Sequence, residues 1–119
     1  MVAVNYLKTR NGVVEYKAGD VIFNNGDTGE HMYGVLEGRV QVISNGLTLD
    51  TVEAGGILGE DIMLGHSSYT TTAIAITDCT LSAMDRHQFL WLVQETPTFA
   101  TQVMSAMSER IKNVSKLID

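Results

Sequence analysis

The sequence predicts a mainly β fold, a closed sandwich or barrel of seven or eight short strands followed by helices. Short apolar runs recur between residues 13 and 84, and clusters of Gly, Asn and Asp separate them at regular spacing. From Asp85 onward the apolar residues change to helical spacing. Strands that follow one another without intervening helices argue against βαβ units.

The turn residues delimit the strands in chain order. Asn11-Gly12 and Asn45-Gly46 are dipeptides typical of tight hairpins, and the densest turn signal spans residues 24–29. Strands are therefore expected at about residues 2–6, 13–16, 21–23, 32–36, 40–42, 47–52, 73–76 and 80–84.

Two helices are expected after the strands, at about residues 86–119. Asp85 is a good N-cap residue, and Gln88 three positions later completes a capping box. Pro97 suits the first turn of the second helix. An apolar seam with spacings of four and three residues follows, formed by Ala100, Met104, Met107, Ile111, Val114 and Ile118. We expect its early positions to pack on the β domain. The positions from Met104 to Ile118 are predicted to form a homodimer interface.

A stretch rich in Gly, Ser and Thr, residues 56–75, is the candidate ligand cradle. Gly55, Gly56 and Gly59 allow close backbone approach to a ligand. Residues 61–64 are about one helical turn long, and their leading N–H groups would face an anion. Hydroxyl groups follow at Ser67, Ser68, Thr70, Thr71 and Thr72. The alternative is a plain loop between two strands, and the sequence leaves both open.

Composition limits the classes of function. The 119 residues suit one domain over 1–119, and a net charge of -6 without a Lys/Arg cluster argues against nucleic-acid binding. Cys79 is the sole cysteine, which predicts a reducing, cytoplasmic compartment. The sequence contains no apolar run of transmembrane length, so no membrane association is expected.

Residues 21–38 (VIFNNGDTGEHMYGVLEG) closely resemble the cyclic-nucleotide-binding domain family, the sensor domains of catabolite-activator-like regulators and of cyclic-AMP-dependent kinase regulatory subunits. Gly59-Glu60 and residues 62–64 look like the phosphate-binding cassette of that family, and residues 97–112 look like its dimerisation helix. The resemblance implies a double-stranded β-helix (jelly-roll) over about 13–84 with flanking helices. It also implies a regulatory, non-enzymatic domain that binds a cyclic nucleotide effector, with no other cofactor.

The resemblance also implies site residues. Gly59 and Glu60 match the pair that meets the ribose, and Thr70 and Thr71 match the small residues after the phosphate-binding arginine. That arginine falls at Tyr69, and no Lys or Arg lies between Arg39 and Arg86. The expected site comprises Gly59, Glu60, Asp61, Ile62, Ser68, Tyr69, Thr70 and Thr71.

A missing arginine weakens phosphate binding by about 3–5 kcal/mol, or roughly 10²–10³-fold or more. We therefore expect ordinary cyclic AMP binding to be poor, and Tyr69→Arg to restore it.

Two functions remain from the sequence. The first is a sensor domain for a small polar effector, and the second is a dimerisation or interaction module with a vestigial pocket. An enzyme is not expected, because no nucleophile or partner acid accompanies Glu60. A metal is not expected either, because His31, His66 and His87 are scattered.

Overall fold

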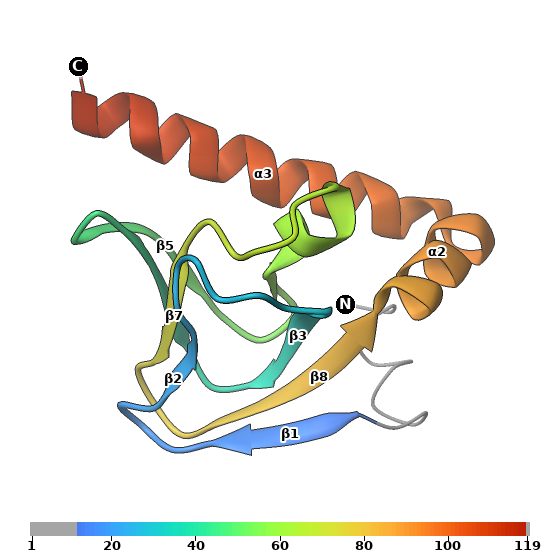
Figure 1. Cartoon of the computed structure of the whole chain (residues 1–119), viewed down its shortest axis with the longest axis horizontal. Helices are drawn as coiled ribbons and strands as arrows, with labels where there is room; N and C mark the ends of the chain where they lie inside the picture. Colours follow the sequence, from blue (N-terminus) through green and yellow to red (C-terminus); the bar gives the residue numbers. More distant parts are fainter. Residues whose placement is uncertain (1–11, 119) are drawn as a thin grey trace.

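Two antiparallel four-stranded sheets form the body of the protein in a computed structural model, which describes residues 12–118 (Figure 1). One sheet has the strand order β1-β8-β3-β6 and the other β2-β7-β4-β5. The strands are β1 (Val13–Tyr16), β2 (Val21–Phe23), β3 (His31–Glu37), β4 (Val40–Ser44), β5 (Leu47–Val52), β6 (Ile57–Leu58), β7 (Thr72–Ala75) and β8 (Cys79–Asp85). This arrangement confirms the predicted mainly β fold. The strand expected at residues 2–6 lies outside the described residues.

The strands fold into a roll because each sheet joins segments that are distant in sequence. β3 pairs with β8 on one side and with β6 on the other, whereas β7 lies between β2 and β4. Alternate side chains point into the space between the sheets, as the period of a strand requires. Val40 and Val42 of β4 and Ala73 and Ala75 of β7 are all buried there. The core therefore lies between the two sheets.

The hairpin between β4 and β5 turns at Asn45-Gly46, as predicted. Both residues have positive φ, 51° and 78°, which suits the right-handed twist of the two flanking strands. The register that follows places Val40 opposite Val52, and both side chains are buried.

Helix α2 (Arg86–Glu95) begins at the predicted capping box. The Asp85 carboxylate accepts from the Gln88 N–H at 2.9 Å, and the Gln88 side chain accepts from the Asp85 N–H at 3.0 Å. Phe89 and Leu92 face the core, but Leu90 does not and is half exposed. The helix therefore docks by a narrower apolar face than its composition suggests.

Helix α3 (Pro97–Ile118) begins at the proline and runs across one end of the roll, close to β5 (Figure 1). Its docking face is formed by Phe99 and Val103, which are buried, and by the half-buried Ala106. Each of these residues immediately precedes a position of the predicted seam. Met104, the first position assigned to the predicted homodimer interface, is 61% exposed and does not pack on the roll. The packing stripe is shifted by one residue, which turns the seam away from the core.

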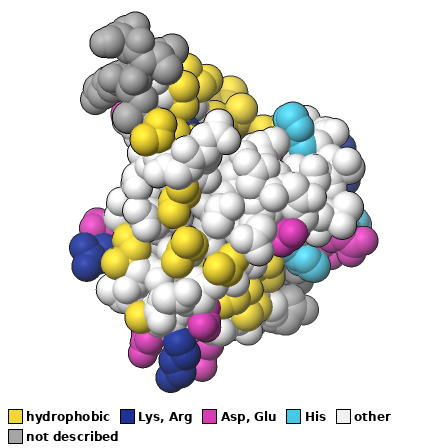
Figure 2. Space-filling model, turned by 60° about the vertical axis from the view of Figure 1, so that its left-hand side comes forward, with side chains coloured by type: hydrophobic (Ala, Val, Ile, Leu, Met, Phe, Trp, Pro, Cys, Tyr) yellow, Lys and Arg dark blue, Asp and Glu magenta, His cyan; other side chains and the backbone are white. Residues whose placement is uncertain are grey.

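The seam is consequently an exposed apolar stripe. Met104, Met107, Ile111 and Val114 are 61%, 36%, 64% and 40% exposed, and Ile118 lies beyond the part of α3 whose side chains are described. In Figure 2, hydrophobic side chains lie near the C-terminal end of the chain, at the top of the view. Dimerisation through this stripe stays a prediction.

Candidate ligand-binding site

A pocket of about 530 Å³ lies between the roll and α3. A volume in this range suits a small molecule. One wall comes from α3, and the others come from β5, from the short 3₁₀ helix η1 (Glu60–Leu64) and from the loop that follows it. The lining residues are Leu49, Glu60, Asp61, Leu64, His66, Thr70, Thr71, Met107, Arg110, Ile111, Val114 and Ser115.

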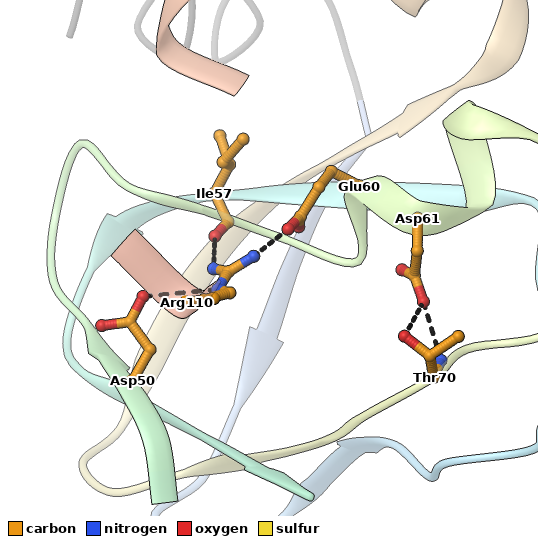
Figure 3. Close-up of polar contacts among 6 residues, drawn as sticks. All are labelled: Asp50, Ile57, Glu60, Asp61, Thr70 and Arg110. Atoms are coloured by element: carbon orange, nitrogen blue, oxygen red, sulfur yellow. Dashed lines mark hydrogen bonds and ion pairs between the residues drawn. The ribbon is translucent and has the colours of Figure 1, made fainter. Parts of the chain in front are cut away.

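Arg110 of α3 connects the helix to the roll at the wall of this pocket (Figure 3). Its Nη1 donates to Glu60 Oε1, its Nη2 donates to the Ile57 carbonyl at 2.5 Å, and its Nε donates to Asp50 at 3.3 Å. One turn further, the Asn113 amide donates to the Leu49 carbonyl. These contacts fix α3 against β5 and η1 by polar bonds where its apolar docking face ends.

Glu60 is buried, with 7% of its surface exposed, and Arg110 balances its charge. Its second oxygen, Oε2, is buried without a hydrogen-bond partner among the described residues. A buried carboxylate oxygen retains the capacity to accept a hydrogen bond.

Arg110 was not among the predicted site residues, although the sequence contains a signal for it. It continues the docking face of α3, four residues after Ala106, and Asn113 follows three residues later. A charged residue that interrupts a buried helical stripe needs a buried partner.

Asp61 and Thr70 face each other on the opposite side of Glu60 from Arg110 (Figure 3). Asp61 Oδ2 accepts from the Thr70 backbone N–H at 2.7 Å and from its hydroxyl at 2.8 Å. This pair ties η1 to the segment that leads into β7. Both residues line the pocket. A ligand there would meet the Asp61 carboxylate, whose Oδ2 already accepts both hydrogen bonds that Thr70 can donate.

Tyr69 points into the core. Its side chain is only 5% exposed, its ring stacks on Phe23 with the centroids 3.9 Å apart, and its hydroxyl donates to the His31 carbonyl at 2.6 Å. Burial raises the pKa of the Tyr69 hydroxyl. Tyr69 does not line the pocket next to α3, and its hydroxyl is already engaged.

Two glycines make room for this ring. A Cβ atom at Gly29 would overlap the Tyr69 ring, and a Cβ atom at Gly59 would come within 3.2 Å of it. Gly59 also has a positive φ of 74°. The close approach that the sequence predicts at Gly59 is therefore to the side chains of the core.

The remaining predicted site residues are divided between pocket and core. Thr71 lines the pocket together with Glu60, Asp61 and Thr70. Ile62 is buried in the core, and Ser68 forms a β-bridge with Thr28. The structure thus brings four of the eight predicted residues to the pocket next to α3.

Metal ligands do not gather in residues 12–118: no group of three or more His, Cys, Asp or Glu side chains there could hold an ion. His66 is exposed at the rim of the pocket.

The β-roll, with a pocket between it and a C-terminal helix, has the architecture of a domain that can take a small molecule. The family model for the cyclic nucleotide-binding domain matches residues 13–96. The chain belongs to the cyclic nucleotide-binding domain family.

Similar proteins include a cGMP-dependent protein kinase of Drosophila melanogaster, 36% identical over 83 residues that make up 70% of this chain and 8% of the kinase. The cyclic AMP receptor protein of Thermus thermophilus is 28% identical over 109 residues, 87% of this chain and 50% of the receptor. The crystal structure of the Thermus thermophilus catabolite activator protein superimposes with a TM-score of 0.78 at 25% identity, covering 99% of this chain and 58% of that one. The chain thus spans at most about half the length of these two curated relatives.

Within the described residues, neither helix is both long enough and apolar enough to cross a membrane.

Proposed function

We propose that the chain is the sensor domain of a regulator, and that a small ligand in the pocket beside α3 changes how this helix docks. One observation carries the proposal: Glu60, a wall of the pocket, is also the residue that Arg110 of α3 holds. A ligand that engages the Glu60 carboxylate would therefore act on a residue that fixes the helix. The family of the chain, whose members include the named cyclic-nucleotide-dependent proteins, supports a sensing role.

Ordinary cyclic nucleotides are proposed to bind poorly. Tyr69 stands where the family resemblance puts the phosphate-binding arginine, and its side chain is buried away from the pocket. Arg110 is the sole guanidinium lining the pocket in the described part of the chain, and it is paired with Glu60 and Asp50. A phosphate would have to compete with both carboxylates for that cation.

Isothermal titration calorimetry with small polar ligands tests the sensing role, and hydrogen exchange of the α3 amides reports helix docking. A ligand that binds should change exchange in residues 106–114 and should raise the melting temperature by mass action. The Arg110→Lys variant keeps the charge but loses the fork of donors, so the ligand-dependent change in exchange should shrink. A ligand that binds in the pocket without altering α3 exchange would contradict the proposal.

The second candidate is a homodimer formed through the exposed apolar stripe of α3. It is favoured by Met104, which is 61% exposed outside the pocket lining, and by Ile111, which is 64% exposed although it also lines the pocket. Such a stripe on a helix is suited to pack against a second helix. In this reading the protein acts in the cytoplasm as a dimer that binds no nucleic acid through this chain.

A further inference from the structure

We infer that the pocket selects an uncharged, hydroxyl-bearing ligand of nucleoside size, and that the Asp61 carboxylate excludes the corresponding phosphorylated ligand. The inference rests on the proposed function, because it assumes that the pocket beside α3 is the sensing site. It names the chemical class of ligand for that site.

The first step is the position of the Asp61 carboxylate. Thr70 offers two donors at the pocket wall, its backbone N–H and its hydroxyl, and both end on Asp61 Oδ2 at 2.7 and 2.8 Å. An anionic group on a ligand would need such donors. Here both Thr70 donors are already bonded to the Asp61 carboxylate.

The second step is the balance of charge around the pocket. Two carboxylates, Glu60 and Asp61, line the pocket beside one guanidinium, Arg110, which pairs with Glu60 and with Asp50 outside the lining. Asp61 has no salt-bridge partner among the described residues, and its charge lines the pocket. A phosphate beside it would experience like-charge repulsion in a partly desolvated site.

The third step is the buried acceptor on Glu60. The side chain is 9% exposed, Oε1 is held by Arg110, and Oε2 is buried without a partner in residues 12–118. A ligand hydroxyl or amine that reached this carboxylate would supply the missing donor. The two carboxylates of the pocket, Glu60 and Asp61, thus favour a ligand that donates hydrogen bonds.

The fourth step is the apolar part of the wall. It is formed by the side chains of Leu49, Leu64, Met107, Ile111 and Val114. Such a surface suits the face of a flat ring. A ring that carries hydroxyl or amino donors and no negative charge matches both parts of the wall, and a nucleoside is a molecule of this description.

Adenosine and cyclic AMP make a matched pair of probes, because they share base and ribose and differ in the cyclic phosphate. Titration calorimetry of the full chain should show adenosine binding at least ~10-fold tighter than cyclic AMP, the equivalent of about 1.4 kcal/mol. Asp61→Asn keeps an acceptor for Thr70 and removes the charge, so it should reduce this preference by ~10-fold or more. Asp61→Ala also frees both Thr70 donors and should reduce the preference further.

Glu53→Gln is the control, because it makes the same change in net charge at an exposed residue outside this pocket. It should leave the preference within about 2-fold of wild type, since surface charges are largely screened. Circular dichroism and melting temperature confirm that each variant is folded.

The outcomes separate the ligand class from the sensing role. If wild type binds cyclic AMP as tightly as adenosine, or if neither Asp61 variant changes the preference, the inference fails while the sensing role stands. If wild type binds cyclic AMP but not adenosine, the ligand class is likewise overturned. If wild type and both variants bind neither probe at millimolar concentration, the sensing role proposed for this pocket fails, and the inference with it.

Discussion

Arg110 of α3 and Glu60 of η1 are fifty residues apart in sequence and form an ion pair at the wall of the pocket, with side chains 12% and 9% exposed. Asp50 and the Ile57 carbonyl share the same guanidinium. The long C-terminal helix is thus held to the roll by a charged side chain at the wall of the pocket.

Removing one partner of this pair should be costly. Arg110→Ala leaves Glu60 buried without a counter-charge, and we expect the free energy of unfolding to fall by about 3–5 kcal/mol, as for buried pairs in general. Urea denaturation measures the loss. Lys112→Ala removes an exposed pair with Glu109 on the same helix and should cost under about 0.5 kcal/mol. Equal effects of the two substitutions would show that the buried pair contributes no more than a surface one.

Tyr69 provides a second test, and the structure reverses the direction expected from the sequence. Tyr69→Arg would put a guanidinium against Phe23 and Gly59 in the core, so we now expect it to destabilise the fold by about 3 kcal/mol or more. Cyclic nucleotide affinity should not improve.

Tyr69→Phe is the matched control, since it keeps the ring and loses only the bond to the His31 carbonyl, at a cost of about 1 kcal/mol. Thermal melting and calorimetry measure both variants. A stable Tyr69→Arg protein that binds cyclic AMP would restore the expectation from the sequence.

The exposed stripe on α3 predicts a concentration-dependent dimer. Met104→Glu places a charge in the stripe without touching the pocket lining, and it should give monomers in analytical ultracentrifugation at tens of micromolar. Thr101→Glu adds the same charge at an exposed polar position of the helix and should remain dimeric if it lies outside the interface. A wild-type protein that is already monomeric under these conditions would rule out this dimer.

The tyrosines of the roll predict a loss of stability in alkali. Burial raises the pKa of Tyr16 to about 12, with Tyr33 as the next cause, and burial also raises the pKa of Tyr33. A raised folded-state pKa favours the neutral hydroxyl, so its contribution is complete below pH 10 and is lost as the pH rises toward 12. Denaturant melts at pH 8 and above pH 10 measure the fall, which should shrink in Tyr16→Phe.

Local signals in the sequence were sufficient for most of the fold. The Asn45-Gly46 hairpin and the Asp85–Gln88 capping box depend on residues that are neighbours in the chain, and both occur as predicted. The docking face of α3 was misplaced by one residue. A second apolar stripe, formed by Phe99, Val103 and Ala106, runs beside the seam. Only the contact with the roll determines which of the two stripes is buried.

The candidate site was harder to predict, because its geometry depends on contacts between residues that are distant in the sequence. Asp61 and Thr70 are nine residues apart, and their side chains meet because η1 folds back on the loop. Arg110 comes from a separate helix, and nothing local to residues 56–75 indicates it. The direction of Tyr69 depends on the space left by Gly29 and Gly59, which is a property of the packed core.

Arg110 joins α3 to Glu60 at the pocket wall, so the proposed sensing role would link helix position and ligand affinity in both directions. If a ligand weakens the docking of α3 by some factor, then holding α3 away from the roll must change the ligand's affinity by that same factor. A protein that binds the C-terminal half of α3 would therefore act as a second effector without contacting the ligand. The ligand's affinity would be measured once with α3 cross-linked to β5 and once without the cross-link. The ratio of the two affinities gives the size of this reciprocal coupling.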